Sequence, residues 1–200
     1  IEAVAREGVL TSVDTWNPEV ARAAAAAGGH LLNDVSGFTK PEMAAVAGEL
    51  GLSACVMHMR GQPRFHYDTD QSYDDINSEV EAFLLERAAA LDVAGAGQVW
   101  LDPGFEFGKS LDDNLAMFGG LRGLVATGRP VLISASRKGF LAELLGHQKR
   151  QDAPGQLEAT LAFNTLAAFE GVHVVRVHDV EPIAQALAVV NGIREHLAQG

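Results

Sequence analysis

Cysteine is almost absent from this 200-residue sequence, which contains one, Cys55. A single thiol cannot form an internal disulfide, so a disulfide-stabilised secreted scaffold is excluded. Cys55 lies in the apolar run SACVM, and we interpret it as buried and structural. Long hydrophobic runs are lacking too: none approaches the ~18 residues of a membrane span, and no signal peptide is visible. We therefore predict a cytoplasmic protein without a membrane partner.

Basic residues are few, with 15 Lys and Arg against 26 Asp and Glu, giving a formal net charge of −11. Such a surface repels phosphate backbones, so we expect no nucleic-acid partner, and an anionic small molecule would need a local basic pocket. Hydrophobic residues make up 48% of the chain, which is enough for one globular domain over 1–200. The chain begins at Ile1 instead of Met, as a fragment of a longer protein would.

The stretch LDPGFEFGKS, residues 101–110, ends like a phosphate-binding P-loop. That loop needs four residues between its first glycine and Gly-Lys-Ser, because this length lets backbone N–H groups surround a phosphate. Here only three residues separate Gly104 from Gly108, and one of them is Glu106, whose carboxylate repels phosphate. The nucleotide hypothesis is rejected. A carboxylate, Asp102, remains at the end of a predicted strand.

Short β-rich runs alternate with longer helical runs six times, the spacing typical of βαβ units. The predicted strands are residues 8–15, 30–36, 53–59, 98–103, 130–136 and 172–179. The predicted helices are residues 17–27, 40–50, 73–95, 111–127, 155–170 and 181–198. The nearly continuous apolar character of the predicted strands favours strands covered on both faces, as in a parallel sheet. Residues 62–72 and 146–154 are predicted to be loops within one domain.

Polar side chains gather where the predicted strands end. The clusters are Asp14-Thr15, Asn33-Asp34, His58-Met59-Arg60, Asp102, Ser136-Arg137-Lys138 and Arg176-Val177-His178-Asp179. In a parallel α/β barrel the carboxyl ends of the strands share one rim, which holds the active site. An open doubly wound sheet usually carries a glycine-rich fingerprint after its first strand, and none is present. The fold class predicted is α/β, a (β/α)8 TIM barrel with about six βα units in this chain.

Six motifs in order carry a resemblance over nearly the whole length: SVDTWNPEVARAAAAAG, LLNDVSG, VMHMRGQP, LDPGFEFGK, SASRKGFL and VVRVHDV. The chain resembles the dihydropteroate synthases of the pterin-binding barrel family. The resemblance implies a transferase of folate biosynthesis, a known sulfonamide target, that condenses 6-hydroxymethyl-7,8-dihydropterin pyrophosphate with p-aminobenzoate and releases pyrophosphate with Mg²⁺ assistance. We also expect a homodimer.

The family assigns pterin contacts to motif positions whose chemistry suits the guanine-like edge of a pterin. The expected pterin contacts are Asp14, Asn33, Met57, Asp102, Phe107, Gly108 and Lys138. A carboxylate accepts from ring N–H and amino donors, an amide donates and accepts, and Lys138 donates to the oxo group. Phe107 and Met57 or Met59 offer apolar faces, and Gly108 is small enough for the ligand to approach.

Arg176 and His178 lie two residues apart in an alternating run and so on one side of the last strand. Together they form an anion clamp, to which the family assigns pyrophosphate; the catalytic set expected is Asp102, Lys138, Arg176 and His178. Structural alternatives stay open. Asp14 and Asp34 could be helix N-caps, and Lys138 could be a solvated lysine in the first turn of a helix. Arg176 could pair with Asp179 or with a carboxylate of a neighbouring strand, and His58 has only a supporting role.

The chain departs from the family in three ways. Gly139 replaces a serine thought to touch p-aminobenzoate, and its N–H at a helix start could substitute. Glu106 replaces a usual glycine. The family's first two βα units, with the first-strand asparagine that contacts metal, have no counterpart. We therefore expect these 200 residues alone to bind pterin poorly and to show no synthase activity. The alternative functions are a pterin-binding methyltransferase using methyl-tetrahydrofolate and a non-catalytic pterin-binding fragment.

Overall fold

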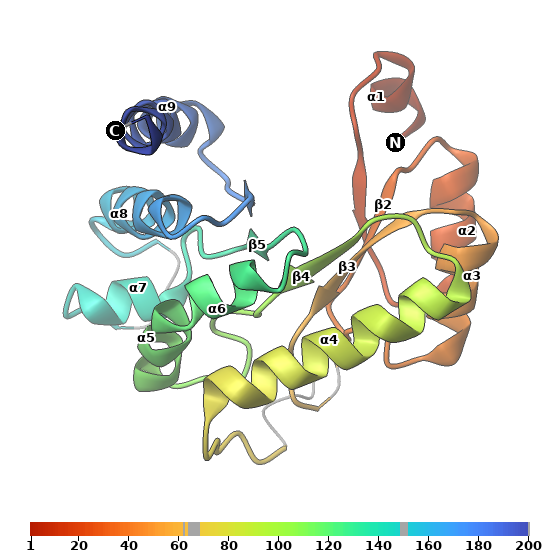
Figure 1. Cartoon of the computed structure of the whole chain (residues 1–200), viewed down its shortest axis with the longest axis horizontal. Coiled ribbons are helices and arrows are strands. Elements are labelled where there is room, and N and C mark those ends of the chain that lie inside the picture. Colours follow the sequence, from red (N-terminus) through yellow and green to blue (C-terminus); the bar gives the residue numbers. More distant parts are fainter. Residues whose placement is uncertain (62, 64–68, 149–151, 200) are drawn as a thin grey trace. The chain divides into compact units, whose positions relative to one another are not determined.

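The structure is a computed structural model that describes residues 1–61, 63, 69–148 and 152–199. Parts of the two predicted loops, residues 62, 64–68 and 149–151, lie outside this description. Strands and helices alternate along the chain (Figure 1). The chain divides into two compact units, Ile1–Gly108 and Lys109–Gly200.

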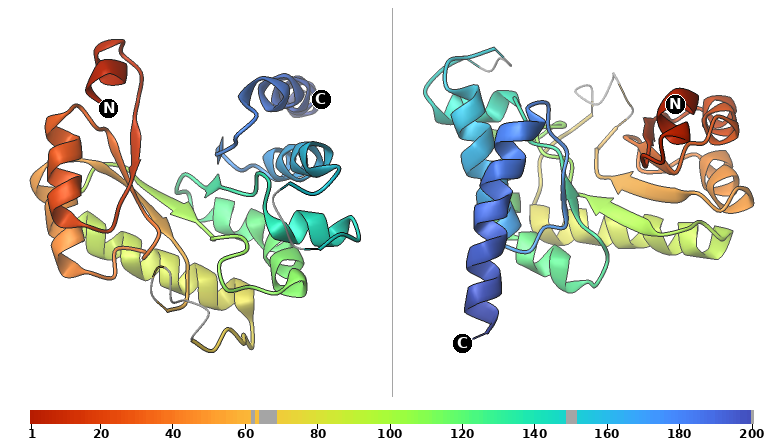
Figure 2. Two further views of the ribbon diagram at one scale, coloured as in Figure 1. Left: turned by 180° about the vertical axis from the view of Figure 1, so that it is seen from behind. Right: turned by 90° about the horizontal axis from the view of Figure 1, so that it is seen from above.

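The first unit is built on a four-stranded parallel sheet with strand order β1-β2-β3-β4. Its elements are α1 (Glu2–Arg6), β1 (Ser12–Asp14), α2 (Pro18–Ala26), β2 (Leu31–Asp34), α3 (Pro41–Glu49), β3 (Ser53–Met57), α4 (Ile76–Ala94) and β4 (Val99–Asp102). Right-handed crossovers between neighbouring parallel strands place every helix on the same face of a sheet. Helices α2, α3 and α4 accordingly lie along one face (Figures 1 and 2).

Local sequence signals explain where these helices begin and end. Proline is the first residue of α2 and of α3, a position where its missing N–H and fixed φ are harmless. The side chain of Asn17 caps α2, and that of Asp75 caps α4. Helix α4 ends at Ala94 and is capped by Gly95, whose φ of 87° belongs to the left-handed region.

The core of the first unit lies between the sheet and its helices. Leu32, Val56 and Leu101 come from three neighbouring strands and are almost completely buried. Helix α4 contacts β3 and β4, and it also packs against α3. A Cβ at Gly48 of α3 would lie 1.8 Å from the carbonyl oxygen of Ala94. Glycine therefore permits the close approach of α3 to the end of α4.

The second unit contains two short parallel strands and five helices among the residues described. Its elements are α5 (Leu111–Gly119), α6 (Leu121–Ala126), β5 (Leu132–Ile133), α7 (Gly139–Leu144), α8 (Gln156–Phe169), β6 (Val174–Val175) and α9 (Val180–Ala198). Phe163 of α8 meets Phe118 and Phe140 edge-on, with ring centroids 5.0 and 5.3 Å apart. Helices α8 and α9 pack side by side (Figures 1 and 2).

All six predicted strands form, and each is shorter than predicted. The last one shrinks most, from 172–179 to Val174–Val175, because its second half runs on as loop. Predicted helix 111–127 is two helices, broken at Gly120. Helix α1 lies outside every predicted helix, and α7 is the helix whose start was expected at Gly139. The single domain over 1–200 stays a prediction beside the two units. No described helix is long and apolar enough to cross a membrane.

Candidate active site

The sheet register places four of the predicted pterin residues on one face of the first unit. Asp14 pairs with Asn33 across β1 and β2, and Met57 pairs with Asp102 across β3 and β4. Asn33 is opposite Cys55, which lies two residues before Met57. Side chains alternate along a strand, so these positions share a face. The fully buried Val56 and Leu101 lie on the opposite, helix-covered face.

Asp14 and Asn33 are in direct contact. The Asn33 Nδ2 atom donates to Oδ1 of Asp14 over 2.7 Å. Asn33 is only 7% exposed, and its buried Oδ1 has no hydrogen-bond partner among the described residues. A buried acceptor without a donor is costly, so such an atom is suited to a ligand N–H. This orphan oxygen is the feature of the face that points most directly to a bound molecule.

Asp102 is buried at the end of β4, with a relative exposure of 3%. Its Oδ1 accepts the backbone N–H of Gly104 over 2.8 Å, which fixes the turn after the strand. Gly104 has a φ of 70°, and a Cβ there would lie 2.1 Å from the carbonyl oxygen of His58. Only glycine fits this turn. The Asp-Pro-Gly sequence therefore holds the carboxylate in one orientation.

The loop after this turn partly meets the sequence expectations. Phe105 is buried and Phe107, the predicted pterin contact, is half-buried. Gly108 has a φ of 64°, and a Cβ there would lie 2.2 Å from Oε1 of Gln71. Its backbone conformation thus accounts for the glycine, and close approach of a ligand there stays a prediction. Glu106 adopts a φ of 73°, a conformation natural to the glycine that the family pattern has at this position.

The N-cap interpretation of Asp14 and Asp34 is wrong, since the residues at the N-caps of α2 and α3 are Asn17 and Lys40. Asp34 instead accepts from the backbone N–H and the hydroxyl of Ser36, over 2.8 and 2.6 Å. It lies next to Val56 in the register, on the helix-covered side of the sheet. Burial raises the pKa of its carboxyl above the ordinary 3.8, a rise that the bonds from Ser36 oppose.

His58 is packed in the first unit, as its predicted supporting role requires. The side chain is 4% exposed, and its ring meets that of Phe83 edge-on at 5.1 Å between centroids. Within the described part of the chain, no three His, Cys, Asp or Glu side chains are grouped so that they could hold a metal ion. The backbone N–H of His58 donates to the carbonyl of Asp102, which extends the ladder between β3 and β4.

The second unit carries Lys138, a predicted pterin contact, and the predicted anion clamp of Arg176 and His178. Lys138 is half-buried at the N-cap position of α7, which begins at Gly139 as expected. Arg176 follows β6, and its N–H donates to the carbonyl of Ile133 over 2.8 Å. The backbone N and ring Nδ1 of His178 lie 3.2 and 3.0 Å from Oγ of Ser136. Residues after β5 are thus bonded to residues after β6.

The structural alternative paired Arg176 with Asp179 or with a carboxylate of a neighbouring strand, and the pairing with Asp179 is wrong. Asp179 binds Arg137 instead, with Nε to Oδ2 at 3.0 Å and Nη2 to Oδ1 at 2.6 Å. From the sequence Arg137 has a place in the cluster Ser136-Arg137-Lys138 but no assigned role. The available signal was an Arg and an Asp in the two strand-end clusters, but partner choice between Arg137 and Arg176 depends on strand register. The sequence also predicts that the polar residues at the strand ends of both units line one common pocket, and this stays a prediction.

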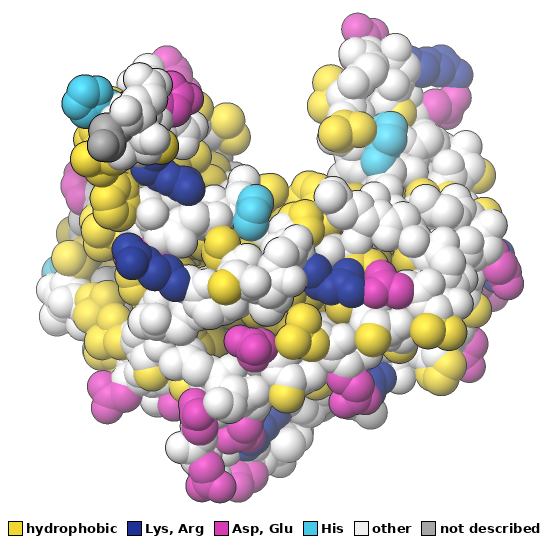
Figure 3. Space-filling view, in the orientation of Figure 1, with side chains coloured by type: hydrophobic (Ala, Val, Ile, Leu, Met, Phe, Trp, Pro, Cys, Tyr) yellow, Lys and Arg dark blue, Asp and Glu magenta, His cyan; other side chains and the backbone are white. Residues whose placement is uncertain are grey.

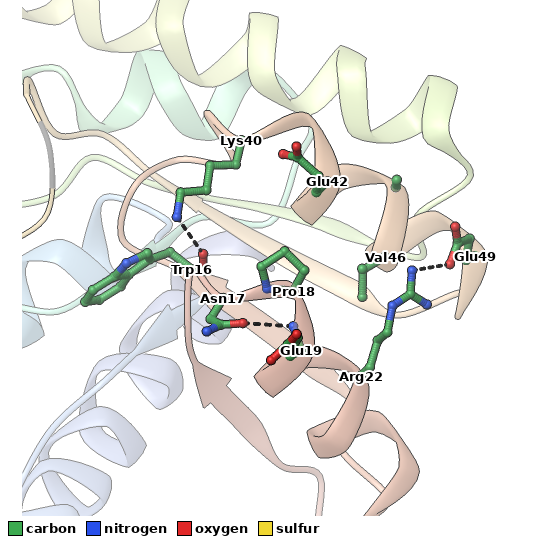
Figure 4. Close-up of a pocket in the computed structure, with 10 residues that line it drawn as sticks. Trp16, Asn17, Pro18, Glu19, Arg22, Lys40, Glu42, Val46 and Glu49 are labelled. Carbon is green, nitrogen blue, oxygen red and sulfur yellow. Dashed lines mark hydrogen bonds and ion pairs between the residues drawn. The ribbon is translucent and has the colours of Figure 1, made fainter.

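A separate groove of about 750 Å³ lies between α2 and α3 (Figure 4). Trp16 and Lys40 are at one end, where the Lys40 Nζ atom donates to the Trp16 carbonyl over 3.4 Å. Arg22 and Glu49 form an ion pair of 2.6 Å between the two helices. None of the predicted site residues lines this groove.

Comparison with known proteins agrees with the sheet geometry and the motifs. Residues 1–178 match the pterin binding enzyme family. The dihydropteroate synthase of Escherichia coli K12 is 37% identical over 95% of this chain and 67% of its own length. That of Mycobacterium leprae is 38% identical over 95% of this chain and 69% of its own.

Solved structures extend the likeness to three dimensions. Dihydropteroate synthase from Thermus thermophilus, in complex with 4-aminobenzoate, matches with a TM-score of 0.89 and 43% identity, over 96% of this chain and 73% of that one. The enzyme from Xanthomonas albilineans, in complex with 7,8-dihydropteroate, matches with a TM-score of 0.85 and 36% identity, over 96% and 70%. The predicted fold class, six βα units of a TIM barrel, is confirmed. The chain belongs to the dihydropteroate synthases of the pterin-binding enzyme family.

Proposed function

We propose that this chain provides the pterin and pyrophosphate sites of a dihydropteroate synthase, which joins p-aminobenzoate to 6-hydroxymethyl-7,8-dihydropterin pyrophosphate and releases pyrophosphate. Dihydropteroate synthases are transferases of folate synthesis. The related Thermus thermophilus enzyme is described in complex with 4-aminobenzoate and with 6HMPPP, and the Yersinia pestis enzyme with a sulfonamide drug. These relatives support the choice of substrates and of inhibitor class for this chain.

The observation that carries the proposal is the polar face formed by Asp14, Asn33 and Asp102. A pterin presents ring N–H and amino donors along one edge. The carboxylate of Asp102 can accept two of them, and the orphan Oδ1 of Asn33 can accept another. Because Nδ2 of Asn33 is bonded to Asp14, the amide cannot rotate freely, and its oxygen stays aimed at the ligand position.

Pyrophosphate binding is assigned to Arg176 and His178 in the second unit, and Lys138 is assigned to the oxo group of the pterin. The planar guanidinium of Arg176 suits two phosphate oxygens at once. When the hydroxyl of Ser136 donates to Nδ1 of His178, the neutral ring carries its proton on Nε2, which then donates to the leaving group. A pterin methyltransferase expels no pyrophosphate and would have no use for this clamp.

Positioning and electrostatics carry the reaction, since no protein nucleophile is needed. Departure of pyrophosphate leaves positive charge on the pterin methylene, which the ring and the nearby carboxylates stabilise. The aniline nitrogen of p-aminobenzoate then attacks that carbon and loses a proton. Mg²⁺ remains part of the proposal, since such an ion would offset the negative charge of the leaving pyrophosphate. Among the described residues no three His, Cys, Asp or Glu side chains are grouped to hold it, and no step above passes through the ion.

Substitution of Asp102 by Asn tests the proposal. The amide oxygen can still accept from Gly104, so the turn and the melting temperature should be kept. The amide nitrogen faces ring donors, and pterin affinity should fall about 100-fold in a calorimetric titration, as expected for loss of ~3 kcal/mol of charge-assisted bonding. Asp112→Asn, an exposed position in α5, is the control. Unchanged pterin affinity in Asp102→Asn would exclude the assignment.

Arg176→Ala tests the pyrophosphate half of the site. Affinity for the pyrophosphate-bearing pterin should fall about 10- to 100-fold, because a charge-assisted bidentate contact is lost. Affinity for bare hydroxymethyl pterin should stay the same, and Arg22→Ala should affect neither ligand. Equal losses for both ligands would mean that Arg176 has only a structural role.

We also propose a cytoplasmic homodimer that contacts neither membrane nor nucleic acid. The net charge of −11 supports the absence of nucleic acid. Hydrophobic side chains are exposed over α8 and α9 on the face seen in Figure 3. Val189, Ile193 and Leu197 follow one another at intervals of four residues and form a stripe along α9. A second copy of the chain is the occupant proposed for this stripe.

A further inference from the structure

Two short segments of the second unit, the residues after β5 and those after β6, are joined by two neighbouring pairs of side chains, which we call the clasp. Ser136, after β5, is bonded to both the backbone N–H and the ring of His178, after β6. The next residues in each segment, Arg137 and Asp179, form the two-bond ion pair described above. The clasp therefore connects the neighbours of Lys138 to the neighbours of Arg176. The Ser136–His178 contacts and the Arg137–Asp179 ion pair both lie within the second unit.

Arg137 is held in a backbone conformation that arginine seldom adopts. Its φ is 55°, in the left-handed region that disfavours residues with a Cβ. Its N–H donates to the hydroxyl of Thr160 over 3.1 Å, and Thr160 is fully buried. Gln156 of the same helix, α8, donates to the carbonyl of Lys138 over 3.1 Å. Such a conformation persists only where surrounding contacts enforce it, and the clasp is one of them.

We propose that Asp179 is a positioning residue whose paired bond with Arg137 holds Lys138 and His178 in the geometry that the pyrophosphate-bearing substrate needs. This inference rests on the proposed function. A bidentate Arg–carboxylate bond fixes orientation as well as distance, which a single bond does not. Asp179 is also the only acidic residue in the clusters that carry Arg137, Lys138 and Arg176, so it offsets their mutual repulsion.

The charge state of the pair suits this role. The hydrogen bond from the Arg137 guanidinium holds the pKa of the Asp179 carboxyl below its ordinary 3.8. Asp179 in turn raises the pKa of Arg137. Both groups are therefore ionised throughout the neutral pH range, and the clasp does not open with physiological changes of pH.

The test compares Asp179→Asn with Glu170→Gln in the whole chain. Glu170 pairs with Arg122 elsewhere in the same unit, away from Lys138 and His178, and is the matched control. Hydrogen exchange of the ligand-free chain reports on the amides of Lys138 and His178, which are bonded to Ala135 and Ser136. Titrations with inorganic pyrophosphate report on the site itself.

Asp179→Asn should speed exchange at those two amides about tenfold and weaken pyrophosphate about tenfold, while Glu170→Gln changes neither. Asp179→Glu, which keeps the charge, should recover part of both. Unchanged exchange in Asp179→Asn would overturn the inference, even if affinity fell, because the residue would then act through charge alone. If the unaltered chain bound neither pyrophosphate nor pterin, the proposed function would fail, and exchange would still decide whether the clasp positions the two segments.

Discussion

Asp34 and Asp102 each end a strand and each accept an N–H two residues further on, yet they face opposite sides of the sheet. Asp102 lies on the polar face with Asp14 and Asn33. Asp34 is fully buried on the helix-covered face, where its charge is costly. Two carboxylates with the same local sequence pattern therefore have different uses, one in the proposed site and one in a turn.

Asp34→Asn should change how stability depends on pH. The folded pKa of Asp34 is raised, so its contribution to stability is fully present below the unfolded value of 3.8 and is lost as pH rises through the folded pKa. The Asn variant has no carboxyl at this position to ionise, so its stability does not fall in this way as pH rises. Its free energy of unfolding relative to the unaltered chain should thus increase from pH 4 to pH 8 in denaturant titrations.

Asp75→Asn is the opposite case and serves as the control for that experiment. The bond from Ser78 lowers the pKa of Asp75, so its contribution to stability is present above pH 3.8 and is lost as pH falls through the folded pKa. The free energy of unfolding of the Asp75 variant should therefore fall furthest below that of the unaltered chain near neutral pH. The same sign of pH dependence in both variants would contradict the burial argument for Asp34.

Glu106→Gly should stabilise the chain or leave it unchanged, although glycine usually destabilises. Relief of the left-handed conformation contributes about 1–2 kcal/mol, and the greater freedom of glycine in the unfolded chain costs about 0.5–1 kcal/mol. Glu86→Gly, inside α4, should lose about 1 kcal/mol. Thermal melts of the two variants provide the measurement, and equal losses would show that side-chain contacts of Glu106 outweigh the backbone term.

At the level of whole elements, α2 and α3 have the same proline start and different caps. Asn17 accepts from the N–H groups of Glu19 and Val20, over 2.9 and 3.4 Å. Lys40 makes no side-chain cap bond to α3, and its positive charge at a helix N-terminus opposes the helix dipole. Helix α2 is therefore the better-capped of two helices that pack against each other beside the groove.

Asn17→Ala should lower the free energy of unfolding by about 1 kcal/mol, because two N–H groups lose their acceptor. Lys40→Asn should raise it by up to about 1 kcal/mol by providing a cap where none exists. Urea titrations of both variants measure the effect. A loss of stability in Lys40→Asn would mean that the contact of Lys40 with the Trp16 carbonyl matters more than the cap.

At the level of the whole molecule, the exposed apolar stripe on α9 sets an expectation for assembly. Ile193→Glu should convert the proposed dimer to a monomer in sedimentation experiments, because a carboxylate would be buried in the interface without a partner. Glu195→Ala, at a neighbouring exposed position, is the control. A monomeric unaltered chain would contradict the proposal outright.

The sequence by itself determined the fold class, the six βα units and the strand ends at which the polar clusters lie. Those features follow from hydrophobic periodicity and local start signals, which act over a few residues. Only the tertiary structure decided which residues face which way and which residues pair. The strand register places Asn33 and Asp102 on one face of the sheet and Asp34 on the other. In the loop after β5, Arg137 and not Arg176 is positioned to bind Asp179. A shift of one residue in register turns every side chain to the opposite face, and packing across the whole sheet selects among such shifts.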